Sequence, residues 1–172
     1  SAALAVVNYK TGPIIRENEE MKRMMTVLDI FGVTYDILDR SSIRTTYTNR
    51  IAESQERGLT LFREKESGAT ALSLSGSGFQ STISVVVALK DDAISGFKVI
   101  SQNETPGLGA RIVEDGFQNQ FIGKKVSGGI TWTKSGKAGP SEFDAITGAT
   151  ESSKALSRIL NDGLNKYFQS SK

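Results

Sequence analysis

The chain has 172 residues, of which 38% are hydrophobic and 23% charged, and this composition is typical of one folded domain with its own core. Its 21 basic and 19 acidic residues give a formal net charge of +2 without a Lys/Arg-dense run, so nucleic acid is not a predicted partner. The sequence contains neither Cys nor His, which excludes Cys-ligated iron–sulfur clusters, Cys/His zinc sites, thiol catalysis and Ser–His triads.

The chain begins at Ser1 without a Met, and an apolar segment follows at residues 2–7. No apolar run reaches the roughly 20 residues that a membrane-spanning helix needs. Two interpretations of residues 2–7 stay open. They are the first turn of an ordinary strand or helix, or they are the end of a membrane anchor that lies upstream of Ser1.

Residues 17–33 predict an amphipathic helix that Gly32 ends. Its apolar side chains follow helical spacing: Met21, Met24, Met25, Leu28 and Phe31. The methionines fit core packing, and a methionine-lined cofactor pocket is the alternative. Residues 41–56 have no clear periodicity, and a helix is one interpretation of them.

Apolar residues then recur at every second position, which predicts strands around 59–62, 69–74 and 83–89. Gly76, Ser77 and Gly78 are expected to break the chain between the last two strands. Asp91 and Asp92 predict a turn, after which residues 94–100 form the second strand of a hairpin.

Residues 103–128 are expected to form a loop with a short helix, and residues 130–133 another strand. A Gly/Pro/Ser loop follows at 135–141, and the chain closes with an amphipathic helix at about 151–168. Short turns between successive strands favour an antiparallel sheet. The sequence thus predicts a single α+β domain, with that sheet flanked by N- and C-terminal helices.

The segment 144–153, Asp-Ala-Ile-Thr-Gly-Ala-Thr-Glu-Ser-Ser, crosses from a loop into the last helix. A helix start has free backbone N–H groups and a partial positive charge, so it suits a phosphate, although Glu151 adds a like charge. The alternative is that Thr147 or Thr150 simply caps the helix. The candidate binding residues are Thr147, Gly148, Ala149, Thr150 and Ser153, with Ser152 as a further hydroxyl donor.

The segment 104–109, Glu-Thr-Pro-Gly-Leu-Gly, is the second candidate. Pro106 and Gly107 predict a tight turn. The flanking glycines expose backbone amides and present the Leu108 side chain, which can lie against a flat ring; an ordinary Gly-rich connection is the alternative. The candidate residues here are Glu104, Thr105, Gly107, Leu108 and Gly109.

Two glycine-rich stretches do not fit nucleotide-binding motifs. Residues 76–78 are followed by a strand instead of the helix of a dinucleotide fingerprint, and residues 136–137 lack the rest of a P-loop. Gly78 remains a candidate for lining a ligand pocket.

Together, segments 104–109 and 144–153 resemble the two hallmark motifs of the FMN-binding domain family. This family includes the subunit designated G of the Rnf electron-transport complex and the subunit designated C of the sodium-translocating NADH:quinone oxidoreductase. The resemblance covers most of the chain and implies one FMN-binding domain over residues 1–172. It implies FMN joined covalently, by a phosphoester to Thr150, through the action of a separate flavin transferase. It also implies an N-terminal membrane helix that holds the domain on the outer, periplasmic face of the cytoplasmic membrane.

The resemblance therefore predicts an electron-transfer subunit of a membrane-bound, ion-translocating redox complex, with other subunits as partners and no complete catalytic site or metal of its own. We expect segment 104–109 to fold over the isoalloxazine ring, with Glu104 accepting a hydrogen bond or placing negative charge near the flavin. The alternatives are an FMN-dependent reductase domain of another respiratory system, a non-redox nucleotide- or phosphate-binding module, and a purely structural domain.

Overall fold

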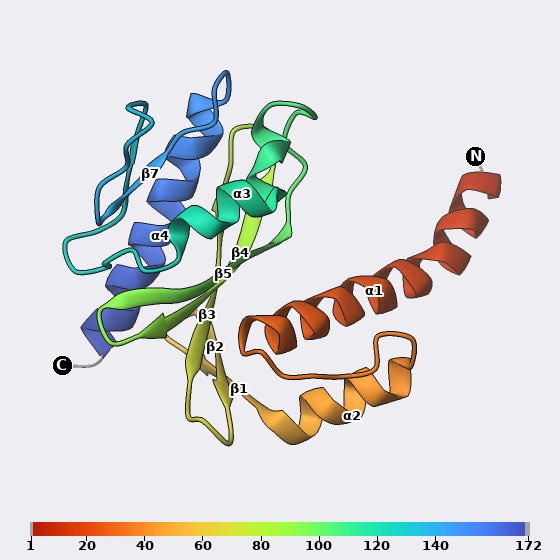
Figure 1. The fold of residues 1–172 in the computed structure, drawn as a ribbon. Helices are drawn as coiled ribbons and strands as arrows, with labels where there is room; N and C mark the ends of the chain where they lie inside the picture. The colour runs from red at the N-terminus through yellow and green to blue at the C-terminus, as the bar shows by residue number, and fades with distance from the viewer. Residues whose placement is uncertain (1, 171–172) are drawn as a thin grey trace.

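The computed structural model describes the backbone of residues 2–170 and the side-chain environments of residues 14–169. It shows one α+β domain with a helix at each end, as the sequence predicts (Figure 1). The helices are α1 (Ala2–Ile30), α2 (Arg40–Arg50), α3 (Asp115–Gln118) and α4 (Thr150–Ser170), with 3₁₀ helices η1 (Gly109–Val113) and η2 (Asn119–Phe121). The strands are β1 (Ile51–Glu56), β2 (Leu59–Glu64), β3 (Thr70–Ser77), β4 (Thr82–Lys90), β5 (Ala93–Ser101), β6 (Thr131–Thr133) and β7 (Glu142–Asp144).

The main sheet has five strands in the order β1-β2-β3-β4-β5, and every neighbouring pair is antiparallel. This confirms the predicted antiparallel sheet and the hairpin between β4 and β5. Asp91 in that hairpin turn has a φ of 54°, a left-handed conformation that Asp tolerates better than most residues.

Helices cover both faces of the sheet, so its central strands bury both sets of alternating side chains (Figure 1). On β4, Val85 and Val87 belong to the core shared with α4. Val86 and Ala88 belong to the core shared with α1 and α2. Met21 is buried in this second core, and Met24 and Met25 pack against it, so these methionines serve core packing.

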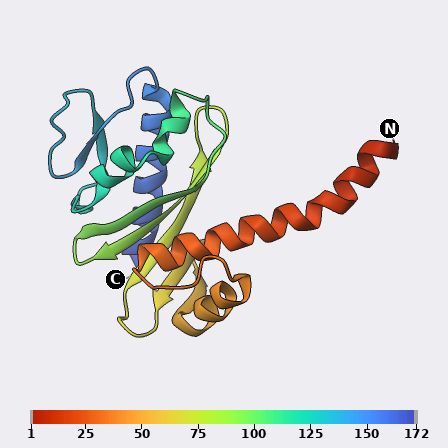
Figure 2. The same ribbon diagram turned by 45° about the vertical axis from the view of Figure 1, so that its right-hand side comes forward.

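The first helix is much longer than the predicted 17–33 segment, and its N-terminal part extends away from the rest of the molecule (Figure 2). It ends as predicted. Gly32 adopts a φ of +66° and its N–H donates to the carbonyl of Asp29, so the glycine conformation closes the helix. Residues 2–7 lie in α1, but their side chains fall outside the described residues, so neither interpretation of that segment is tested. Within the described chain, no helix is both long and apolar enough to cross a membrane.

Three local predictions were wrong or incomplete. A helix is one interpretation of residues 41–56, but α2 ends at Arg50 and β1 follows. Only Ile51 of that strand is buried, so no alternation of apolar residues marks the strand in the sequence.

Gly76 and Ser77 continue β3 instead of breaking it. An added Cβ at Gly76 would lie 2.8 Å from Ile159 Cγ1, so this glycine lets α4 pack closely on the strand. The short strand β7, which pairs in parallel with β6, was not predicted.

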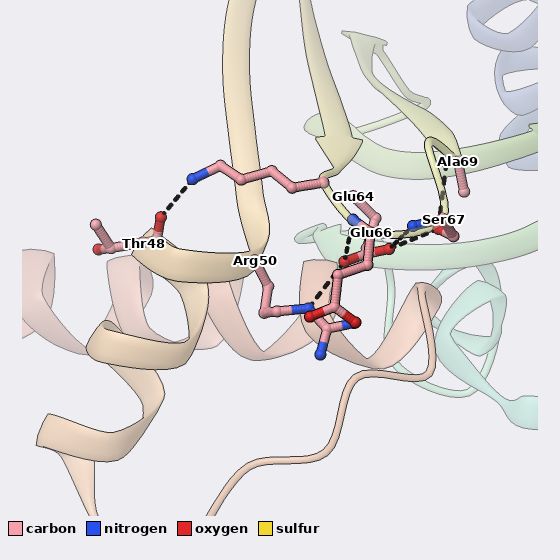
Figure 3. Close-up of polar contacts among 7 residues, drawn as sticks. Thr48, Arg50, Glu64, Glu66, Ser67 and Ala69 are labelled. Atoms are coloured by element: carbon pink, nitrogen blue, oxygen red, sulfur yellow. Dashed lines mark hydrogen bonds and ion pairs between the residues drawn. The ribbon is translucent and has the colours of Figure 1, made fainter.

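A buried ion pair secures the junction of α2, β1 and the β2–β3 turn (Figure 3). Glu64 is 1% exposed, and its carboxylate accepts hydrogen bonds from the Ser67 hydroxyl and N–H, both at 2.6 Å, and from Arg50 Nε at 2.9 Å. The Ser67 bonds, followed by the Arg50 bond, lower the pKa of Glu64 to about 2, although burial raises it. Glu64 therefore stabilises the folded state in its ionised form.

We predict that Glu64→Gln lowers the free energy of unfolding by about 2–3 kcal/mol at pH 7, because it removes hydrogen bonds to a buried charge. The folded-state pKa lies below the unfolded value, so this contribution is present above about pH 4.5 and is lost as the pH falls towards 2. The difference from wild type should therefore shrink between pH 7 and pH 3 in thermal unfolding. Glu66→Gln is the matched control: Glu66 also pairs with Arg50 but is 69% exposed, so its loss should cost under about 0.5 kcal/mol. Equal effects of the two substitutions would contradict the prediction.

Candidate functional site

A buried carboxylate, Glu104, lies at the meeting point of three segments that are far apart in sequence. Glu104 follows β5 and is 4% exposed. Its Oε1 accepts hydrogen bonds from the N–H groups of Gln80 at 3.0 Å and Ser81 at 3.1 Å, in the turn between β3 and β4. Its Oε2 accepts from the hydroxyl of Ser152 at 2.6 Å, in the first turn of α4. One side chain thus ties segment 104–109 to the β3–β4 turn and to the start of α4.

These hydrogen bonds keep Glu104 ionised despite its burial. Burial raises the pKa of Glu104, and the bonds from Ser152 and from the backbone of the β3–β4 turn lower it, so that the net pKa lies below the usual value. A buried carboxylate is stable only when donors surround it, and the donors here come from both neighbouring segments.

Two glycines, Gly78 and Gly109, leave space for the Glu104 carboxylate and its partner. An added Cβ at Gly78 would lie 2.5 Å from Glu104 Oε1. At Gly109 it would collide with Ser152 Oγ and lie 3.0 Å from Glu104 Oε2. Contacts that short do not occur in folded proteins without displacement, so both positions require glycine for close packing rather than for an unusual φ.

The loop before α4 is held by its own hydrogen bonds. Ser153 is fully buried, and its hydroxyl accepts from the N–H of Ile146 and donates to the carbonyl of Ala149, both at 3.2 Å. Gly148 has a φ of +81°, and a Cβ there would lie 3.1 Å from Leu108 Cδ2, so Leu108 packs directly on this glycine. The two motif segments are therefore in contact.

Helix α4 begins at Thr150, whose side chain is partly exposed. Among the described residues, the backbone N–H groups of Thr150, Glu151 and Ser152 have no hydrogen-bond acceptor, as expected for the first turn of a helix. Glu151 forms an ion pair with Lys154 at 2.8 Å, so its negative charge is partly offset.

Two adjoining clefts meet at Thr150. The first, of about 370 Å³, is lined in part by Thr105, Leu108, Ala149 and Phe79. The second, of about 330 Å³, is lined in part by Thr147, Asp144 and Gly136. Three residues line both clefts: Lys134, Gly148 and Thr150.

Lys134 lies at these clefts because the two ends of segment 133–145 are hydrogen-bonded to each other. The N–H of Ala145 donates to the carbonyl of Thr133 at 2.7 Å, and β6 pairs in parallel with β7. The start of the loop between β6 and β7 is bonded to the end of β7, since the Gly136 N–H donates to Asp144 Oδ1 at 2.8 Å. This pairing sets Lys134 next to the start of α4.

Sequence comparison agrees with this geometry. The model of the FMN-binding domain family matches residues 78–165, just over half of the chain, and this span contains Glu104, both clefts and Thr150. The chain belongs to the FMN-binding domain family.

The chain is also similar to components of known redox complexes, in both cases to the subunit designated G. That of the Na⁺-translocating ferredoxin:NAD⁺ oxidoreductase complex of Acetobacterium woodii is 27% identical over 180 residues, covering 100% of this chain and 86% of that protein. That of the proton-translocating ferredoxin:NAD⁺ oxidoreductase complex of Clostridium ljungdahlii is 36% identical over 90 residues, covering 52% of this chain and 48% of that protein. This second match thus spans about half of the relative's length.

A solved structure shares the fold. The crystal structure of the subunit designated C of the Na⁺-translocating NADH-quinone reductase from Parabacteroides distasonis matches with a TM-score of 0.74 and 25% identity, covering 91% of this chain and 94% of that one. The α+β architecture predicted from the sequence is therefore also that of a related protein.

Within this FMN-binding domain, the predicted site residues fall into two groups. Those that line the clefts are Thr105, Leu108, Gly109, Thr147, Gly148, Ala149 and Thr150. Gly78, Glu104 and Ser153 line neither cleft, and their close contacts and hydrogen bonds hold the surrounding segments together. Gly107 lines neither cleft; its φ of +73° makes it a turn residue.

Outside the two motif segments, sequence reasoning missed the cleft residues Phe79, Lys134 and Gly136, the last of which was assigned only to a loop. Phe79 directly follows Gly78, which was a candidate, but no periodicity separates it from an ordinary turn residue. Lys134 sits at the end of a predicted strand, and no local spacing relates it to Thr150. All three enter the site only through tertiary contacts.

We predict that Gly109→Ala destabilises the protein by about 1–3 kcal/mol, because a methyl group there must displace Ser152 or Glu104. Gly116→Ala is the matched control. Gly116 lies in α3 with open space around its Cα, so Ala should be neutral or slightly stabilising. Thermal unfolding of the two variants measures the difference, and an unaffected Gly109→Ala variant would show that the Glu104–Ser152 pair is not tightly packed.

Proposed function

We propose that this protein is an electron-transfer subunit of a membrane-bound, ion-translocating redox complex, and that it carries FMN as a phosphoester of Thr150. The main support for attachment at Thr150 is its position, at the start of α4 and on the wall of both clefts. The family match and the names of the related subunits support the cofactor and the type of complex. The partners in this proposal are the other subunits of the complex and a flavin transferase.

The residues around Thr150 fit the phosphate end of FMN. The first turn of α4 offers N–H groups that no described residue accepts from, and the positive end of the helix dipole. Lys134 lines both clefts, and none of the described residues forms an ion pair with it. A phosphodiester retains one negative charge, which these groups would stabilise.

The first cleft fits the isoalloxazine end of FMN. Leu108 packs on Gly148 and presents an apolar surface that is 43% exposed, within the same cleft as the Thr150 side chain. An apolar surface next to a few polar groups is typical of ligand pockets. Bound FMN would supply the electron-transfer chemistry at this site.

Attachment requires Thr150 Oγ to form a bond to phosphorus and to lose its hydroxyl proton to a base. Condensing an alcohol with a phosphate monoester in water is unfavourable. The proposal therefore includes a flavin phosphoanhydride as the donor, whose anhydride P–O bond breaks as the ester bond forms and whose second half leaves as a phosphate. The transferase would supply the base, because the described part of the chain has no carboxylate among the hydrogen-bond partners of Thr150.

The proposal also includes a membrane anchor upstream of residue 1 and an outer-face, periplasmic position for the domain. The apolar segment 2–7 and its place at the start of α1 support the anchor. The name of the related subunit supports a membrane-bound complex, because translocating an ion requires a membrane.

We predict that Thr150→Ala, co-expressed with a flavin transferase, lacks the mass increase of one FMN less one water that wild type shows. Thr150→Ser keeps a hydroxyl at the same place and should retain some modification. Thr147→Ala should still gain the mass of the flavin, because it leaves the Thr150 hydroxyl in place, but more slowly, because Thr147 lines the second cleft. Intact-mass measurement distinguishes these results, and a flavin that persists in Thr150→Ala would assign the ester to another residue. Thermal unfolding should show that all three variants fold, since a helix-start hydroxyl contributes only about 0.5–2 kcal/mol.

We also predict that Lys134→Ala slows flavin attachment about two- to fivefold at limiting transferase, as expected for loss of an exposed charge pair. The effect should shrink at high salt, because salt screens exposed charges. Lys137→Ala is the matched control, since Lys137 is an exposed lysine of the same loop that lines neither cleft. Equal rates for the two variants would remove Lys134 from the phosphate site.

A further inference from the structure

Phe79 is an exposed aromatic residue whose position is fixed by its neighbours rather than by its own burial. Its side chain is 62% exposed, at the turn between β3 and β4, and it lines the same cleft as Leu108 and Thr150. Among the described residues that line the two clefts, Phe79 is the only aromatic one. An aromatic ring left in water forgoes the stabilisation of burial, so a ring held at a cleft mouth is a candidate ligand contact.

The turn that carries Phe79 is rigid. Its N–H donates to Glu104 Oε2 at 3.3 Å, and the next two N–H groups donate to Glu104 Oε1. The Gly78 N–H donates to the carbonyl of Ser81 at 2.7 Å, and the hydroxyl of Ser81 accepts from the N–H of Asn103 at 2.8 Å. These hydrogen bonds fix the backbone of the β3–β4 turn, so its conformation does not depend on where the Phe79 side chain packs.

The same carboxylate also fixes the other end of the cleft. Glu104 Oε2 accepts from the Ser152 hydroxyl at 2.6 Å, two residues after Thr150. The segment that presents Phe79 and the helix turn that presents Thr150 are therefore bonded to a single side chain. This arrangement sets the spacing between an aromatic surface and the proposed point of phosphate attachment.

We propose that Phe79 contacts the isoalloxazine ring of the flavin carried on Thr150 and forms, with Leu108, the apolar wall of the ring subsite. Glu104 is the positioning residue for this contact. The inference rests on the proposed function. A flat aromatic ring packs favourably on another, and the contact excludes water from part of the flavin.

The test uses flavinylated protein and a residue that quenches flavin fluorescence only on contact. An indole passes an electron to a photoexcited flavin at van der Waals range, so Phe79→Trp should lower the fluorescence per attached flavin several-fold. Phe168→Trp is the matched control. Phe168 is also an exposed aromatic, 39% exposed, but it lies 18 positions further along α4, about 27 Å from Thr150, and should leave the fluorescence unchanged.

A second variant keeps the proposal testable if the wild-type flavin is already weakly fluorescent. Phe79→Ala should admit water to the ring and shift the visible absorbance bands and the reduction potential, whereas Ile122→Ala, at an exposed apolar residue outside both clefts, should not. Unchanged absorbance and potential in Phe79→Ala, together with unchanged fluorescence in Phe79→Trp, would overturn the inference while the mass increase still supported the flavin ester. A wild-type protein without that mass increase would overturn the proposed function and this inference with it.

Discussion

The site depends on one interaction, the capture of the buried Glu104 carboxylate by donors from two distant segments. A carboxylate away from water is costly unless its oxygens are hydrogen-bonded, so the β3–β4 turn and the start of α4 must both approach it. That approach explains why Gly78 and Gly109 carry no side chain, since a Cβ at either position would intrude on the carboxylate or its partner. The clefts at Thr150 lie where these segments converge.

The sheet supplies the frame that holds this arrangement in place. Its central strands are buried on both faces, with α4 packed on one and α1 and α2 on the other. Close contacts at Gly76 with Ile159, and at Gly163 with Leu74, set α4 tightly against β3. The start of α4 therefore has a fixed position relative to the β3–β4 turn, which a site with reproducible geometry requires.

The clefts combine two environments within one small surface. Free helix amides and Lys134 favour an anion, while Leu108 and Phe79 offer apolar surface. FMN has an anionic end and a flat aromatic end, and both match what these residues provide. This pairing, within a member of the FMN-binding domain family, favours a domain that holds FMN over a module that binds only a phosphate.

Local sequence determined the elements whose signal lies in neighbouring residues. The alternation of β3 to β5, the glycine end of α1 and the placement of 144–153 at a helix start all follow from spacing and residue type. Only the tertiary structure decided β1, which buries one side chain, and β7, which has three residues, since both are defined by the strands they pair with. It also decided the donors of Glu104, which come from the β3–β4 turn and the first turn of α4, while its place near the flavin stays a prediction. Phe79 and Lys134 join Thr150 for the same reason: contacts between distant segments depend on how sheet and helices pack, which no local pattern records.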